Sequence, residues 1–164
     1  MHSTYVITLF DFNYWANRHI LSVAGELADA EFTASSDITT RDLRGTLVHT
    51  LDVEWSWRLR LQGRPKEEWA SQKELRATDY PDTTTLAEHW SRDEAEMRAW
   101  LATLKDEVLA RNVELGPKER FPLWYYLVHI VMHGQQQRSD AAVLLTRLGH
   151  SPGNIDFLDF ADSL

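Results

Sequence analysis

Residues 122–148 read PLWYYLVHIVMHGQQQRSDAAVLLTRL, and apolar side chains recur in this stretch every three or four positions. Such spacing places them along one side of an α-helix. The members of this apolar stripe are Leu123, Leu127, Ile130, Gly134, Ala141, Leu144 and Leu148. Pro122 suits the first position of a helix, where its missing N–H has no partner to lose, and Gly149 is a typical stop. The spacing predicts one long amphipathic helix.

The same stretch carries His129, His133 and Gln137 at successive four-residue steps. At about 100° per residue, each step drifts by only about 40°, so neighbours in this series point nearly the same way and can share one metal ion. Measured from the centre of the apolar stripe, Gln137 falls within about 20°, His133 within about 50° and His129 about 90° away. We expect His133 and Gln137 to face inward. His129 is expected at the margin of the apolar stripe, where it would pack against neighbours or hold a metal ligand in place without binding the metal itself.

Three further segments show helical spacing, at residues 4–27, 39–61 and 84–110. The first and second are joined by a predicted loop, and the second and third by a long irregular connection that contains Gly63, Pro65 and Pro81. The candidate N-terminal caps of the second and third segments are Asp37, Thr39, Thr40, Thr84 and Thr85. Glu88 is placed to complete a capping box in the third segment.

Only one short strand is expected, Val113–Leu115, in a small hairpin where Gly116-Pro117 interrupts the helical pattern. Four helices without a sustained strand pattern predict an all-α protein, an up-down or crossover four-helix bundle. A length of 164 residues fits a single domain, residues 1–164.

The composition excludes several classes of function. A formal charge of −8 without a cluster of Lys and Arg argues against a nucleic-acid partner. The absence of cysteine excludes disulfides, thiolate metal ligands and a cysteine nucleophile, so any metal must be bound by nitrogen or oxygen. No apolar run approaches a membrane span, and the N-terminus lacks the pattern of a signal peptide. We expect a soluble, cytoplasmic protein with no membrane partner.

His49, midway along the second predicted helix, is the best candidate to meet the fourth helix. Val53 and Trp57 follow it at four-residue steps on the same side and suggest an enclosed environment. A bundle core can hold a metal when a facing helix completes the ligand set. The alternative is that these histidines are hydrogen-bonded core residues. Gln137 also weakens a zinc or nickel site, because a neutral amide oxygen suits harder ions better than an imidazole does.

Glu54 and Asp52, about one turn beyond His49, are the candidates for a general base near such a metal. The alternative for both carboxylates is a solvated helix face. Arg138 and Asp140 are expected to form surface ion pairs. The aromatic residues Trp55, Trp57, Trp124, Tyr125 and Tyr126 fit either the wall of a pocket or packing in the core or a dimer.

Several motifs recur together across nearly the whole chain: Tyr14-Trp15-Ala16-Asn17, then His49 with Glu54 and Trp57, then His129-x-x-x-His133-Gly-Gln-Gln-Gln137-Arg138, and finally Gly149-His-Ser-Pro-Gly. In this combination the chain resembles the DinB-like superfamily, also called DinB/YfiT-like metalloenzymes, which are damage-inducible bacterial proteins. The resemblance implies a four-helix bundle, often present as a homodimer. This expectation agrees with the helical periodicity.

The resemblance also implies a divalent metal, zinc, nickel or similar, held by three histidines. One belongs to the second helix and two, four residues apart, to the fourth. Carried over to this chain, the metal ligands are His49, His133 and position 137. Position 137 holds Gln137 in place of histidine, which puts metal binding in question. A shifted site that uses His129 instead is the alternative.

The resemblance implies a metal-dependent enzyme that transfers a thiol or hydrolyses a small electrophile, with a small molecule as substrate. In thiol transfer the metal would act as a Lewis acid, and the sulfur would arrive with the substrate, because the chain has no cysteine. The competing hypothesis is a degenerate, non-catalytic bundle that binds a small molecule or protein, with a weakened or absent metal site. Gln137 is the residue that favours this second hypothesis.

Overall fold

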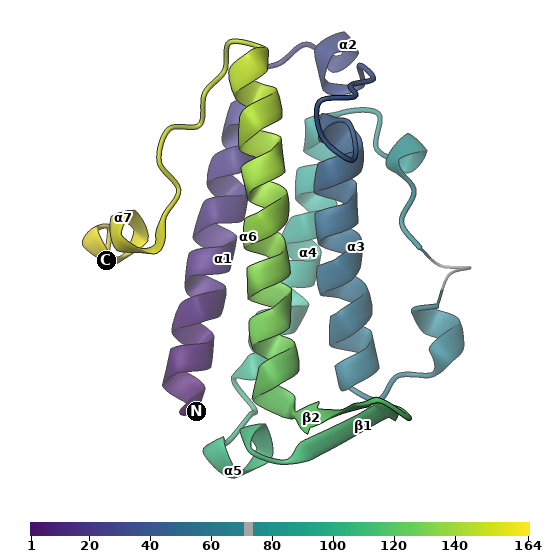
Figure 1. Ribbon diagram of the computed structural model, residues 1–164, viewed down its shortest axis with the longest axis vertical. Coiled ribbons are helices and arrows are strands. Elements are labelled where there is room, and N and C mark those ends of the chain that lie inside the picture. The colour runs from purple at the N-terminus through teal and green to yellow at the C-terminus, as the bar shows by residue number, and fades with distance from the viewer. Residues whose placement is uncertain (71–73) are drawn as a thin grey trace.

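The computed structural model describes residues 1–70 and 74–164, and the chain is mostly helical (Figure 1). Four long helices lie side by side: α1 (Ser3–Ala24), α3 (Leu43–Leu61), α4 (Thr83–Leu101) and α6 (Leu123–Arg147). The short helical elements are α2 (Asp29–Phe32), η1 (Lys66–Glu68), η3 (Ala77–Asp79), α5 (Asp106–Leu109) and α7 (Phe157–Asp162). The predicted hairpin is present as the antiparallel pair β1 (Asn112–Gly116) and β2 (Glu119–Pro122).

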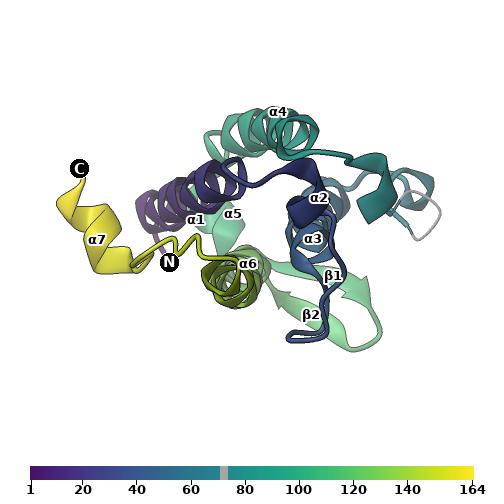
Figure 2. The same cartoon turned by 90° about the horizontal axis from the view of Figure 1, so that it is seen from above.

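Seen from above, the four long helices stand around a common centre, with α4 diagonally opposite α6 (Figure 2). Helix α6 packs against α1 and α3, and these two helices also contact α4. The hairpin leads directly into α6, and the N–H of Leu123 donates to the carbonyl of Arg111 just before β1. Within the described ranges no helix is long and apolar enough to cross a membrane.

Two groups of buried apolar side chains fill the interior, one toward each end of the long helices. One group includes Ile20, Leu51, Leu86 and Leu144, and the other includes Phe10, Met97, Leu127 and Ile130. On each long helix, buried polar residues lie between these two groups in sequence, and they form a central polar layer. Its members are Asn13, Asn17, Glu54, Arg58, Trp90, Asp93 and Arg138.

The centre of this polar layer is the carboxylate of Glu54, whose residue is only 1% exposed. Its Oε1 accepts hydrogen bonds from the side-chain amides of Asn13 at 2.8 Å and Asn17 at 3.0 Å, and its Oε2 accepts from the indole of Trp90 at 3.0 Å. The guanidinium of Arg138, also 1% exposed, donates to the amide oxygens of the same two asparagines. The two asparagines therefore connect a buried carboxylate on α3 with a buried guanidinium on α6.

Gly134 lets α6 approach α1 closely enough for this network. A Cβ atom at Gly134 would lie 2.8 Å from Oδ1 of Asn13 and 3.0 Å from Nη1 of Arg138. Both separations are shorter than side chains tolerate, so any larger residue would push the two helices apart or displace Arg138. The prediction that Arg138 forms a surface ion pair is wrong, because its guanidinium is buried between the helices.

The helix boundaries differ from the sequence prediction in three places. Helix α3 is capped by Asp42, which accepts from the N–H of Gly45, whereas the hydroxyl of Thr39 instead donates to the carbonyl of Arg41. Helix α4 is capped by Asp82, which accepts from the N–H of Thr85, so Thr84 and Thr85 lie inside the helix. The predicted caps, listed above, are therefore wrong. The short helix α2 falls in the predicted loop.

The third predicted helix ends at Leu101 instead of continuing to residue 110. The hydroxyl of Thr103 donates to the carbonyl of Trp100, which satisfies one of the acceptors left at the helix end. Asp106 then begins α5 and accepts from the N–H of Ser3, and this hydrogen bond lowers the pKa of the Asp106 carboxyl to about 2. This hydrogen bond ties the start of α1 to α5 after the chain has left the helical path.

Replacing Glu54 with alanine should destabilise the fold strongly. Three buried hydrogen-bond donors would lose their acceptor, and a buried guanidinium would lose the negative charge that compensates its own. We expect the free energy of unfolding to fall by at least about 3 kcal/mol. Urea unfolding followed by circular dichroism measures this change. Glu88→Ala is the matched control, since Glu88 is exposed on α4, and its effect should stay within about 0.5 kcal/mol. Equal effects of the two substitutions would contradict a structural role for Glu54.

Candidate functional site

The structure brings His49 of α3 and His133 of α6 together. Their ring centroids are 5.1 Å apart, and the rings are arranged edge to face, with an interplanar angle of 75°. Both residues are half-buried, where α3 and α6 pack against each other. His49 precedes Glu54 on α3, and His133 precedes Arg138 on α6, by five residues, which is about one turn and a half. Because the two helices run in opposite directions, the two buried charges lie on opposite sides of the facing pair (Figure 1).

Both imidazoles are poised to be neutral. Burial lowers the pKa of His133 to about 4, and the neighbouring His49 and His129 act in the same direction. Burial, followed by the charge of Arg41, lowers the pKa of His49. The Nδ1 atom of His133 is buried and has no hydrogen-bond partner in the structure. A neutral imidazole is the form that binds metal ions, so the environment of the pair favours the ligand state.

Gln137 follows one turn further along α6 and is 7% exposed. Its side chain makes no hydrogen bond with any residue in the described ranges. His129, one turn before His133, is exposed and packs its ring against Trp57, with 5.4 Å between the ring centroids. The order of burial along α6 is thus the order expected from the helical wheel: Gln137 is most buried and His129 least.

The two facing imidazoles fit a shared divalent ion. Two imidazoles that bind one ion at about 2.1 Å and at a tetrahedral angle have ring centroids about 5 Å apart. The separation of His49 and His133 is close to this value. Across residues 1–70 and 74–164, however, no three His, Cys, Asp or Glu side chains converge in a way that could hold a metal ion. The pair therefore lacks a third strong donor in its present arrangement.

Neither carboxylate proposed as a general base lies on a solvated helix face. Glu54 is enclosed and accepts three hydrogen bonds in the polar layer, and burial raises the pKa of its carboxyl. Asp52 is also buried, and its Oδ1 accepts from the N–H of Leu75 at 2.9 Å. Glu54 therefore has a structural role, and Asp52 anchors the connection after η1 to helix α3.

A cleft of about 350 Å³ opens beside Trp57. The guanidinium of Arg60 lies 4.9 Å from the ring of Trp57 and 5.4 Å from the ring of Trp69, and it also pairs with Glu119. The remaining walls include Asp52, Ser56 and Lys66. Sequence reasoning did not find Arg60 or Trp69. The spacing of Trp57 and Arg60 on α3 was visible, but nothing indicated that Trp69 folds back beside them.

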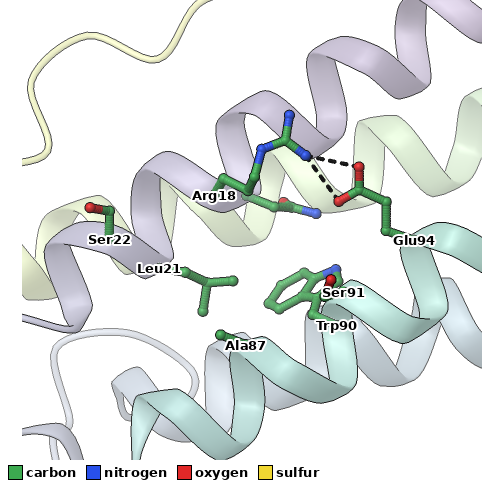
Figure 3. A pocket seen from close by; sticks show the side chains of 8 residues that line it. Arg18, Leu21, Ser22, Ala87, Trp90, Ser91 and Glu94 are labelled. Carbon is green, nitrogen blue, oxygen red and sulfur yellow. Dashed lines mark hydrogen bonds and ion pairs between the residues drawn. The ribbon is translucent and has the colours of Figure 1, made fainter.

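A second hollow, of about 430 Å³, lies between α1 and α4 (Figure 3). Arg18 and Glu94 form a two-point ion pair beside it, and the indole of Trp90 lies against its apolar side chains. No histidine lines this hollow, and it lies between helices other than the α3 and α6 that carry the imidazole pair. It therefore contributes nothing to a metal site.

The model of the DinB family matches residues 1–164, the entire chain. The chain belongs to the DinB family. A search of curated proteins found no match. In this DinB protein, the residues that the sequence resemblance implied as ligands are His49 and His133, which face each other, and Gln137, which is buried one turn beyond His133.

The pKa of His133 predicts how the stability of metal-free protein depends on pH. Its folded-state pKa of about 4 lies below the ordinary value of 6.5, so the unfolded chain binds the proton more readily. The stabilising contribution of neutral His133 is complete above about pH 6.5 and is lost as pH falls toward 4. We expect His133→Asn to lose less stability than wild type between pH 7 and pH 4.5.

Urea unfolding after treatment with EDTA measures this difference. His150→Asn is the control, because it removes an imidazole that lies beyond the end of α6, away from His133, and should follow the wild-type pH dependence. An identical loss of stability on acidification in wild type and His133→Asn would show that the environment of His133 does not disfavour its protonation.

Proposed function

We propose that this DinB protein is a divalent-metal-dependent enzyme that transfers a thiol or hydrolyses a small electrophile. We also propose that its four long helices form the four-helix bundle of DinB-like proteins. The observation that carries the functional proposal is the facing pair of His49 and His133, 5.1 Å apart between ring centroids, each held in the neutral state by burial. Family membership over the whole chain supports the same assignment.

The residues that would hold the ion are His49 and His133, with Gln137 at the third position implied by the family resemblance. The buried, unpartnered Nδ1 of His133 supports this role, because a buried polar atom without a partner is costly and a ligand would compensate it. The amide oxygen of Gln137 is neutral and is a weaker donor toward zinc or nickel than an imidazole. When bound, a divalent ion would supply Lewis-acid chemistry that lowers the pKa of a thiol or of water.

The chain itself contributes position and enclosure. Helix α3 presents His49, and α6 presents His133, with 5.1 Å between the ring centroids, where the two helices pack against each other. The cleft beside Trp57 offers room for a small molecule near His129, because Trp57 lines the cleft and contacts that ring, although no histidine in the described part of the chain lines the cleft itself. A volume of about 350 Å³ is near the lower end of ligand-binding pockets.

A second candidate function is a non-catalytic member of the family that binds a small molecule or a protein. Two observations favour it: Gln137 stands where the family resemblance implies histidine, and no three His, Cys, Asp or Glu side chains in the described part of the chain converge on one point. Under this alternative the imidazole pair would be a remnant of a metal site.

Metal content distinguishes the two functions. We expect untagged protein purified from cells to contain a divalent metal by elemental analysis, and His49→Ala and His133→Ala to lose it, because each removes an imidazole donor. Gln137→His should raise metal affinity by at least about 10-fold, since it adds a nitrogen donor in an already enclosed position. His150→Ala, which removes a histidine near the C-terminal end of α6, is the control and should leave metal content unchanged.

Absence of metal from wild type, even after incubation with zinc or nickel salts, would refute the enzymatic proposal and leave the binding function. Metal retained equally by wild type, His49→Ala and His133→Ala would show that the ion is bound elsewhere.

We further propose that the protein is a homodimer that uses the outer face of α6. This face carries the exposed apolar residues Tyr125 (47%), Met132 (54%) and Val143 (47%). The sequence between residues 123 and 146 has two charged residues. Arg138 is buried, and Asp140 is half-buried. A long exposed helix face with apolar side chains and no fully exposed charge is typical of an interaction surface, and a chain with a net charge of −8 could approach its own copy there without facing like charges.

Light scattering coupled to size-exclusion chromatography should give a mass of about 38 kDa, twice the 19.0 kDa of one chain. Met132→Glu should shift the mass toward that of a single chain, because it places two carboxylates in a desolvated interface. Ala99→Glu, at an exposed position on α4, is the matched control and should remain dimeric. A wild-type mass near 19 kDa would refute the dimer.

A further inference from the structure

A third imidazole lies within reach of the facing pair. His129 is one turn before His133 on α6, on the side away from Gln137, and its ring centroid is 6.2 Å from that of His133. His133 thus stands between two other imidazoles, with His49 at 5.1 Å and His129 at 6.2 Å. His49 belongs to α3, and His129 and His133 belong to α6. Both helices contribute residues to the buried polar layer.

We infer that this protein holds its metal ion with His49, His129 and His133, one helical turn away from the position that Gln137 occupies. The inference rests on the proposed metal-dependent function and names a different third ligand from the one that the family resemblance implies. It restores a set of three nitrogen donors in a chain that has glutamine at position 137.

The chemistry of the donors favours His129 over Gln137. Two histidines four residues apart on a helix face the same way and are a known chelating arrangement for zinc, because both rings can turn toward one point. His129 and His133 have this spacing, as do His133 and Gln137. Only the first pair supplies two imidazoles, and imidazole is the stronger ligand for zinc, nickel and copper than a neutral amide oxygen.

The surroundings of His129 allow the movement that the site requires. The present separation of His129 and His133 exceeds by about 1 Å the separation of about 5 Å expected for two rings on a tetrahedral ion. This explains why the three imidazoles do not already converge in the described structure. Because His129 is exposed, its side chain can change rotamer without disturbing the core. Its edge-on contact with Trp57, at 5.4 Å between centroids, keeps it beside the pair.

The position of the cleft gives the shifted site a route for a substrate. Trp57 touches His129 and also lines the cleft of about 350 Å³ that contains Arg60 and Trp69. An ion on the His129 side of His133 would therefore border this cleft. Gln137, by contrast, is 7% exposed and lies toward the interior, where a small molecule has less access.

The test compares metal affinity in single-residue variants of the full chain. Untagged protein is stripped with EDTA and titrated with Zn²⁺ by calorimetry, and with Co²⁺, whose visible spectrum reports the number and type of its ligands. His129→Phe keeps a ring against Trp57 but has no donor atom, and Gln137→Ala removes the competing amide. We expect His129→Phe to weaken Zn²⁺ binding by at least about 10-fold and to change the Co²⁺ spectrum. Gln137→Ala should weaken binding by less than about 3-fold and leave the spectrum unchanged.

Two results would overturn the inference in distinguishable ways. If wild type binds Zn²⁺ through His49 and His133 but His129→Phe binds with unchanged affinity and spectrum, His129 is not a ligand and the proposed function stands. If wild type binds neither ion, the proposed function fails together with the inference. His150→Phe controls for nonspecific binding to accessible imidazoles, and thermal unfolding confirms that each variant is folded.

Discussion

The buried carboxylate of Glu54 is the interaction on which the rest of the structure depends. It accepts hydrogen bonds from α1 and α4 while belonging to α3, and through Asn13 and Asn17 it is connected to Arg138 of α6. All four long helices therefore meet at one polar layer with a fixed register. Since an isolated buried charge is strongly unfavourable, any sliding of one helix past another would break this compensation. The apolar groups on either side of the layer provide burial, but side chains of similar size could pack in more than one register.

The two asparagines explain how opposite charges can be buried here without direct contact. Each amide donates through its nitrogen to Glu54 and accepts through its oxygen from Arg138, so the two amides link the buried carboxylate to the buried guanidinium. Burial raises the pKa of the Glu54 carboxyl, and the three hydrogen bonds it accepts oppose that shift. Burial lowers the pKa of Arg138 to about 10, and the charge of Glu54 opposes that shift. Gly134 completes the arrangement, because only a residue without a side chain leaves room for Asn13 and Arg138.

The imidazole pair lies between two buried charges. His49 precedes Glu54 on α3 and His133 precedes Arg138 on α6, each by five residues, and because these two helices run in opposite directions, the two charges lie on opposite sides of the pair along the helices (Figure 1). The same burial that fixes them keeps both rings neutral, which is the state required of a nitrogen ligand. Stability and the proposed chemistry are thus coupled through the backbone of α3 and α6. The proposed metal site needs a third ligand besides this pair. That ligand is either the buried amide of Gln137 or the exposed ring of His129.

The sequence by itself determined the long helices, the hairpin and the inward direction of His133 and Gln137, because apolar periodicity and four-residue spacing are local properties of a helix. Helix caps such as Asp42 and Asp82 were missed, since several polar residues stood near each boundary and only the final backbone path selects one. Tertiary structure alone decided that Glu54 and Arg138 are buried partners and not surface charges. Their burial depends on donors and acceptors from helices distant in sequence, and no spacing within α3 or α6 contains that information. For the same reason, the fold alone brought Trp69 to the guanidinium of Arg60, which also lies against Trp57.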